Sequence, residues 1–206
     1  LSVDPTRGPL LGLLVEKPSL RERVDQGGLV GYMILGLGAL SLVLAVFKLI
    51  DILLLSLGIS MQARKLSSPG AGNPLGRLLQ TWHEYRQRDA EVLAMRLHDR
   101  VAKESGRIHR FTIFLAIIAA VAPLMGLLGT VTGMINTFQA ITLYGTGDPQ
   151  TMAGGISQAL VTTVLGLVVA IPTTLLYAFL NTRSKGIVAV LQEQSSGVIA
   201  ERAERG

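Results

Sequence analysis

Three long apolar runs constrain this chain more than any other feature of its sequence. They extend from Leu29 to about Leu57, from Phe111 to about Ile141 and from about Ser157 to Leu180. About 20 apolar residues in an α-helix cross the ~30 Å hydrocarbon layer of a bilayer. Because lipid offers no hydrogen-bond partner to the backbone, such runs must be helical in a membrane. The sequence therefore predicts an all-α membrane protein with three transmembrane helices.

Charged residues are scarce and clustered, as a membrane protein requires. They make up 16% of the chain, against about a quarter in soluble domains. The net charge of +5 arises mainly between and after the apolar runs, so membrane topology accounts for it better than nucleic-acid binding. The chain has no cysteine, which excludes disulfides and thiolate chemistry. It begins at Leu1 rather than Met, so we expect a longer product with any signal peptide out of view.

Basic residues predict how the spans are oriented. Eleven Lys and Arg lie between the first two spans, counting Lys48 and Arg110, and four follow the third span. The connection between the second and third spans has none, and carries only Asp148. Cytoplasmic flanks of membrane helices collect Lys and Arg. We therefore expect the long loop and the tail in the cytoplasm, and the N-terminus and the short turn in the periplasm.

This topology divides the chain into seven segments. They are a periplasmic amphipathic segment (1–28), the first span (29–57), a cytoplasmic linker and helix (58–110), the second span (111–141), a periplasmic turn (142–156), the third span (157–180) and a cytoplasmic C-terminal helix (181–206). Ser19 and Glu22 have the spacing of a capping box, which predicts a short helix ending at Gly27 and Gly28. A helix from about Leu75 to Arg110 is expected to run straight into the second span. Two of the membrane helices would then extend into the cytoplasm.

Lys48 and Asp51 interrupt the first apolar run. They lie three residues apart and so share one face of the expected helix. We interpret them as an interfacial pair that marks where this helix leaves the lipid.

The sequence lacks the motifs of an enzyme. His83, His98 and His109 do not have metal-ligand spacing, and we interpret them as surface or packing residues. There is no glycine-rich phosphate loop before a helix, no GxSxG motif and no cluster of carboxylates. The sequence therefore predicts a protein that is not an enzyme and that uses no metal or cofactor.

Small and hydroxyl-bearing residues recur at helical spacing in the second and third runs. In the second run they are Gly126, Gly129, Thr130, Gly133 and Thr137, and in the third they are Gln158, Thr162, Thr163 and Gly166. Small residues let membrane helices approach closely, so we interpret the glycines as packing residues. Both runs place hydroxyls at mid-membrane depth, which makes Thr130 and Thr163 candidates for a polar pathway.

Titratable groups are almost absent from this region. Between Phe111 and Leu180 the ionisable residues are Tyr144, Asp148 and Tyr177. A proton relay through lipid normally uses a carboxylate or a histidine at depth. If this chain helps to conduct protons, we expect it to line a path while another polypeptide supplies the titrating group.

Two motifs in these runs resemble those of a known family. Pro123–Gly133 (PLMGLLGTVTG) is similar to the second-span signature of the MotA/TolQ/ExbB proton channel family, and Gly154–Pro172 (GGISQALVTTVLGLVVAIP) to its third-span signature. The three-span layout resembles ExbB and TolQ rather than the four-span MotA. Asp4–Gly8 (DPTRG) resembles the TtpC-like ExbB proteins, which have a long periplasmic extension and serve TonB-linked uptake.

The resemblance implies an assembly and a set of functional residues. Family members form a homo-oligomeric, pentameric ring around the helices of a single-span ExbD/TolR-like partner, whose aspartate carries the protons, and ExbB works with a TonB-like protein. Thr130 and Thr163 match the ring threonines that face this aspartate. With Gln158, Thr162 and Thr137 they form the expected pore-lining set, and Gly126, Gly129, Gly133, Gly166, Pro123 and Pro172 the expected packing set. The two prolines either shape the pore lining or are tolerated kinks.

Gln158 departs from the family pattern, because many ExbB proteins have a glutamate at this position. This departure favours a partner that titrates alone. The resemblance thus implies an ExbB-like subunit of a motor, driven by the proton-motive force, in the inner membrane of a Gram-negative bacterium. A TolQ-like role in envelope integrity and a non-conducting scaffold are the alternatives. The chain shows no inverted repeat or broken helix pair, which disfavours a substrate-carrying transporter.

Overall fold

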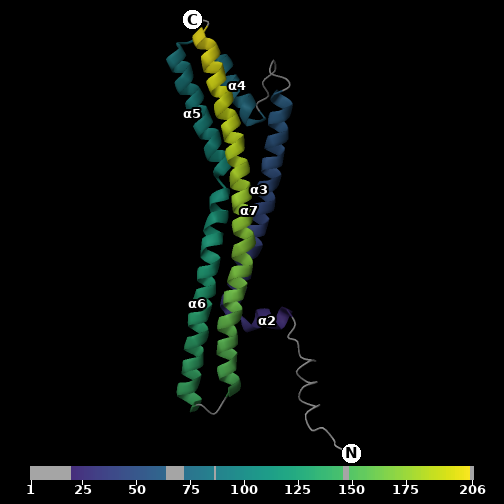
Figure 1. The fold of residues 1–206 in the computed structure, drawn as a ribbon, viewed down its shortest axis with the longest axis vertical. Helices are drawn as coiled ribbons and strands as arrows, with labels where there is room; N and C mark the ends of the chain where they lie inside the picture. Colours follow the sequence, from purple (N-terminus) through teal and green to yellow (C-terminus); the bar gives the residue numbers. More distant parts are fainter. Residues whose placement is uncertain (1–19, 64–71, 86, 146–148, 205–206) are drawn as a thin grey trace, which may run out of the picture. The chain divides into compact units, whose positions relative to one another are not determined.

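A computed structural model of the chain describes residues 20–63, 72–85, 87–145 and 149–204. These residues form helices and connecting turns (Figure 1), and no strand occurs among them. The helices are α2 (Leu20–Gln26), α3 (Gly28–Ala63), α4 (Pro74–Tyr85), α5 (Ala90–His109), α6 (Thr112–Tyr144) and α7 (Pro149–Glu204). The Asp4–Gly8 motif and Ser19 lie outside the described residues.

Helices α3, α6 and α7 each contain a segment long and apolar enough to cross a membrane. These segments are Gly28–Gly58, Thr112–Leu143 and Met152–Ala200. Large apolar side chains on the three helices are exposed, among them Leu54, Leu124 and Leu175. Exposed apolar surface of this extent requires lipid or another helix to cover it. The prediction of an all-α membrane protein with three long apolar helices is confirmed.

The helices divide into two compact units. The first unit comprises Leu1–Gly38 and Ala120–Ala170, and the second comprises Ala39–Ala119 and Ile171–Gly206. The division falls within α3, α6 and α7, so each of these helices contributes a segment to both units.

The first unit consists of α2, the start of α3 and the adjoining segments of α6 and α7. Its α6 and α7 segments run antiparallel, side by side (Figure 1). A small core of Val30, Ile34, Ala122, Val169 and Ala170 is buried between the helices.

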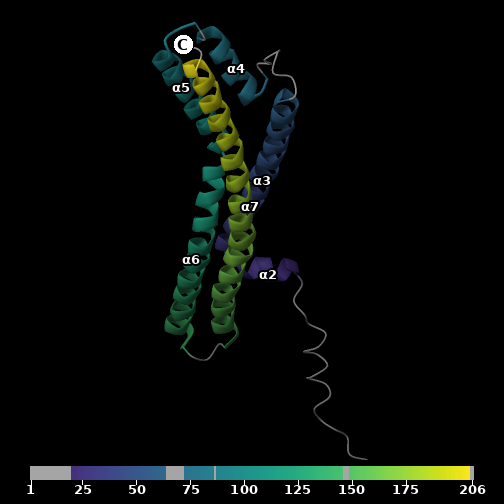
Figure 2. The ribbon, with the colours of Figure 1, turned by 45° about the horizontal axis from the view of Figure 1, so that its top comes forward.

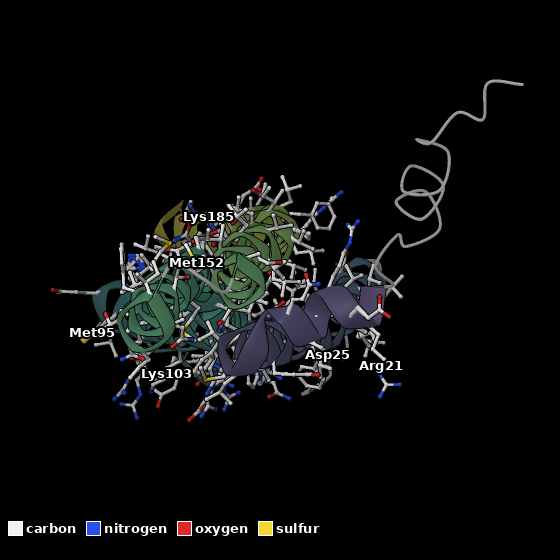
Figure 3. The ribbon with its side chains drawn as sticks, turned by 90° about the horizontal axis from the view of Figure 1, so that it is seen from below. Arg21, Asp25, Met95, Lys103, Met152 and Lys185 are labelled. Atoms are coloured by element: carbon white, nitrogen blue, oxygen red, sulfur yellow. The ribbon has the colours of Figure 1, made fainter. Side chains whose placement is uncertain are left out.

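The turn between α2 and α3 depends on a glycine. Gly28 has a φ of +58°, in the left-handed region that costs any side-chain-bearing residue about 1–2 kcal/mol. This glycine turns the chain sharply from α2 into α3. Arg21 and Asp25 lie on α2 and are labelled in Figure 3.

The second unit has the larger core. Leucines from four helices are buried there, together with smaller apolar residues: Leu78 and Leu79 of α4, Leu93 and Leu97 of α5, Leu115 of α6, and Leu180 and Leu191 of α7. Figures 1 and 2 both show α5 beside the C-terminal part of α7.

The prediction of a single helix from about Leu75 to Arg110 is wrong. The structure has two helices here: α4 ends at Tyr85, and α5 begins at Ala90. Arg88 donates to the Tyr85 carbonyl at 2.9 Å, and Leu93 donates to the Asp89 carbonyl at 3.0 Å. The break lets the apolar stripes of both helices face one core, whereas a continuous helix would leave one stripe uncovered.

Two further boundaries differ from expectation. Helix α5 does not run unbroken into α6, because Arg110 donates to the Arg107 carbonyl at 3.4 Å and a short turn separates the helices. In contrast, the third span and the C-terminal helix are one continuous helix, α7, of 56 residues. Both α6 and α7 continue through their internal prolines, Pro123 and Pro172.

Candidate functional site

Glycines bring α6 and α7 into close contact in the first unit. A Cβ atom on Gly133 would lie 2.7 Å from the Gly155 carbonyl oxygen, and one on Gly166 would lie 2.8 Å from the Ala122 carbonyl oxygen. A Cβ on Gly126 would lie 3.1 Å from the Thr162 carbonyl oxygen. Because these neighbours are backbone atoms, they have little room to move aside. The approach of the two helices therefore requires glycine, as in other small-residue membrane contacts.

Two threonines fill the space that the glycines leave. Thr162 is fully buried opposite Gly129, and Thr137 is buried opposite Gly155. The Thr162 hydroxyl lies 3.0 Å from the carbonyls of both Gln158 and Ala159, and the Thr137 hydroxyl donates to the Gly133 carbonyl at 3.0 Å. Both hydroxyls thus bond within their own helix and lie inside the contact, away from the surface.

Thr130 and Thr163 lie partly exposed on the same helix pair. Their hydroxyls donate to the carbonyls of Leu127 at 2.7 Å and Ala159 at 3.2 Å. A Cβ on Gly126 would lie 3.3 Å from the Thr163 Cα, and Thr130 follows Gly126 by about one helical turn. The two hydroxyls are therefore about one turn apart along the helix pair, on the order of 5.4 Å. Each hydroxyl oxygen retains a lone pair that can accept a hydrogen bond.

Gln158 of α7 lies close to α6 and to the start of α3 in the first unit. Its Oε1 accepts from Asn136 Nδ2 of α6 at 3.3 Å. Its Nε2 lies 3.0 Å from where a Cβ on Gly28 would be, at the start of α3. Ser157, the preceding residue, donates to Gln26 Oε1 of α2 at 3.1 Å. The neutral amide of Gln158 therefore links α7 to α6 and lies beside the turn that precedes α3.

The partners of Gln158 and Ser157 were not predicted from the sequence. Asn136 is a polar residue in an apolar run, and this could have marked it as a candidate. Gln26 carried no such signal, because a glutamine on a short polar helix is ordinary.

The helix pair is electrically neutral over the described residues of its first-unit segments. They include no Asp, Glu, Lys, Arg or His between 120 and 170, and Asp148 lies outside the described residues. Throughout the described part of the chain, no group of three or more His, Cys, Asp or Glu could hold a metal ion. His83 and His98 are exposed, and His109 Nδ1 lies 3.0 Å from the Ser105 carbonyl.

The second unit contains a buried charge cluster around Glu104. Arg77 of α4 bonds both carboxylate oxygens, with Nη2 at 2.6 Å from Oε2 and Nε at 2.9 Å from Oε1. Arg100 and Arg107 lie within 3.7 Å of the same carboxylate. Burial alone would raise the pKa of Glu104, but the hydrogen bonds and charge of Arg77, with Arg100 and Arg107, lower it overall. A two-pronged ion pair of this kind fastens α4 to α5.

These features define a polytopic helical membrane subunit with a neutral, hydroxyl-bearing face. The chain belongs to the MotA/TolQ/ExbB proton channel family, whose sequence profile matches residues 71–193.

Relatives of known name are ExbB and ExbB-like proteins. A biopolymer transport protein, ExbB-like 1, of Synechocystis sp. is 31% identical over 197 residues, which is 87% of this chain and 76% of the relative. ExbB of Pseudomonas putida is 37% identical over 109 residues, covering 53% of this chain and 33% of the relative. ExbB of Neisseria meningitidis serogroup B is 36% identical over 126 residues, covering 54% of this chain and 57% of the relative.

The chain thus spans most of the first relative but under two thirds of the other two. The expected similarity to ExbB is confirmed. The family and the three apolar helices make the chain a multi-pass inner-membrane subunit of the proton-channel motor class, which is not a known class of enzyme.

Proposed function

We propose that this protein is an ExbB-like ring subunit of an inner-membrane motor that energises TonB-dependent outer-membrane transport. The observation that carries the proposal is the pair of partly exposed hydroxyls, Thr130 and Thr163, on otherwise apolar helices. Hydroxyl oxygens near the middle of the membrane can accept a hydrogen bond from a protonated acid on a neighbouring helix, and they carry no charge of their own.

The neutrality of the face supports a partner that supplies the titrating group. A carboxylate on the single-span helix of an ExbD/TolR-like partner would take up a proton beside Thr130 and Thr163 and release it on the inner side. One elementary charge crossing the membrane provides about 2.3 kcal/mol per 100 mV. Repeated uptake and release would then move the partner against a ring of this subunit, pentameric by resemblance, and a TonB-like protein would receive the motion.

Gln158 belongs to this proposal as a neutral bridge. Its amide keeps the outer part of the face uncharged where many relatives have glutamate. Thr137 and Thr162 take a different role from the one expected of them. Their burial against Gly155 and Gly129 makes us propose packing for both.

The proposed topology follows from the basic residues. The connection at 58–110 and the C-terminal part of α7 carry most of the Lys and Arg, so we place both in the cytoplasm. The N-terminus and the turn between α6 and α7 would then face the periplasm.

The test compares three isosteric threonine variants in the complex with its partner. We expect Thr130→Val and Thr163→Val to lower proton flux into liposomes by tenfold or more, along with energised uptake. Thr132→Val is the matched control, because Thr132 also bonds within its own helix but lies two residues from Thr130, on another face. Unimpaired flux in Thr130→Val and Thr163→Val, with normal assembly, would remove both hydroxyls from the mechanism.

Complementation separates the related roles. Rescue of a strain that lacks ExbB supports TonB-dependent transport, whereas rescue only of a strain that lacks TolQ assigns the ring to envelope integrity. Absence of proton flux with the partner present identifies a scaffold.

A further inference from the structure

Lys48 is a fully buried cation in the second unit. It lies in the membrane-spanning segment of α3, and its side chain has no exposed surface. This burial differs from the interfacial placement expected from the sequence, in which the ammonium would extend to water. The ammonium donates to Asp51 Oδ2 at 2.7 Å. An ammonium has three N–H donors, and Asp51 is its one hydrogen-bond partner among the described residues.

Three buried hydroxyls in the same unit have no partner among the described residues. They are Thr112 Oγ1 at the start of α6, and Ser184 Oγ and Ser195 Oγ in α7. Ser195 lies about three helical turns beyond Ser184 along α7, so Thr112 and Ser184 are the two considered with Lys48. Thr112 is 2% exposed and Ser184 is 0% exposed. Leaving a buried hydroxyl unpaired is costly, so each requires an explanation.

Two contacts place these hydroxyls near the level of Lys48. The rings of Phe47 and Phe111 meet edge to face at 5.7 Å, which puts the start of α6 at the level of Phe47 and Lys48 along α3. The buried hydroxyls of Ser41 and Thr173 lie 3.0 Å apart, and α3 and α7 run in the same direction (Figure 1). Seven residues beyond this contact, Lys48 is level with Leu180, and Ser184 follows one helical turn later.

Asp51 of the ion pair also borders a small hollow. Asp51 is 40% exposed and lines a hollow of about 180 Å³, together with Arg77, Glu104 and Arg107. A water molecule takes up about 30 Å³ of liquid, so the hollow has room for several. Its two acidic and two basic side chains balance in charge, which favours water over a bound ion.

We propose that bound water hydrates Lys48 in the core of the second unit and bridges its ammonium to the Thr112 and Ser184 hydroxyls. The water exchanges with the hollow past Asp51. Buried charges persist only when they are paired and hydrogen-bonded, and a buried water usually makes about three hydrogen bonds. The site gives each subunit a fixed, hydrated cation inside its first membrane helix, and it does not depend on the proposed proton pathway.

The sign of a stability change tests the proposal. Thr112→Val and Ser184→Ala are measured by thermal unfolding of the full chain. If the hydroxyls hold water, each variant lowers the unfolding midpoint by about 2–4 °C. If they are dry and unpaired, their removal leaves the midpoint unchanged or raises it, and that result overturns the proposal. Thr182→Val is the control, because its hydroxyl is exposed and bonds the Ala178 carbonyl.

The same two substitutions made in a Lys48→Met variant test whether the water is bound to Lys48. In Lys48→Met the effects of Thr112→Val and Ser184→Ala should shrink to less than half, and undiminished effects would show that the lysine is not part of the site. Should Lys48→Met fail to fold, a high-resolution map of the native complex decides. Water density between the three side chains supports the site, and a dry core overturns it.

Discussion

Gly129 of α6 and Thr162 of α7 fit together so closely that a Cβ atom on Gly129 would coincide with the Thr162 side chain. This relationship explains why a buried threonine on α7 faces a glycine on α6. The threonine fills the recess that the glycine leaves, and its hydroxyl bonds within its own helix. The packing surface and the partly exposed hydroxyls of Thr130 and Thr163 thus belong to different sides of one helix pair.

A methyl group at Gly129 should disrupt this contact. We expect Gly129→Ala to lower stability by about 1–3 kcal/mol through overpacking, measured as the thermal midpoint of the detergent-extracted protein. Gly154→Ala is the matched control, since no atom lies within 4 Å of a Cβ there and alanine favours a helix. Combining Gly129→Ala with Thr162→Gly should recover part of the loss. Equal midpoints for Gly129→Ala and Gly154→Ala would contradict the packing described.

The turn between α2 and α3 should depend on Gly28 for two reasons. Its φ of +58° disfavours any side chain, and a Cβ there would lie 3.0 Å from Gln158 Nε2. We expect Gly28→Ala to cost about 1–2 kcal/mol and to loosen α2, which limited proteolysis can detect. Gly36→Ala, where a Cβ meets no atom within 4 Å, should be tolerated. Unchanged cleavage in Gly28→Ala would argue against a strained turn.

The Glu104 cluster should make stability depend on pH in the acid range. Because the pKa of Glu104 is lowered in the folded protein, its stabilising contribution is complete above the ordinary value of 4.5 and is lost as the pH falls through the folded value. Glu104→Gln should cost about 1–3 kcal/mol at neutral pH, and the difference from the native protein should shrink as the pH drops below about 4.5.

Asp99→Asn provides the control for this measurement. Asp99 pairs with Lys103 at 2.8 Å, but both side chains are more than half exposed, and exposed pairs contribute little. The unfolding midpoint of Asp99→Asn should match that of the native protein at neutral pH. A difference between native protein and Glu104→Gln that grows in acid would contradict the direction of the Glu104 pKa.

The absence of cysteine allows the topology to be tested with single substitutions. We expect Asp148→Cys to react with a membrane-impermeant maleimide in cells whose outer membrane has been permeabilised. Lys103→Cys, at a side chain that is 64% exposed, should react only after the inner membrane is opened. The reverse pattern would invert the proposed orientation.

Much of the fold could be predicted because its signals are local. Run length and hydropathy marked the segments of α3, α6 and α7 that can cross a membrane. The glycine pair at Gly27 and Gly28 marked the end of α2. The end of α4 at Tyr85 was not predicted, because the apolar residues have helical spacing both before and after it. Only the shared core formed by Leu78, Leu93 and their neighbours makes a hairpin more favourable than one long helix.

The candidate site, like the fold, could be predicted only in part. Hydroxyl spacing along α6 and α7 indicated a polar face, but it grouped Thr137 and Thr162 with Thr130 and Thr163. Spacing along one helix cannot tell which hydroxyl meets a glycine across a contact. The pairing of Gln158 with Asn136 depends likewise on the register of two helices.

By itself, then, the sequence determined that this protein has three membrane helices and a neutral face in the bilayer, because both properties are sums over consecutive residues. Only the tertiary structure decided which threonines are buried, where the chain turns between α4 and α5, and that Lys48 lies inside the core. Each of these depends on contacts between residues far apart in the chain, and the free energy of such contacts has no counterpart in local sequence.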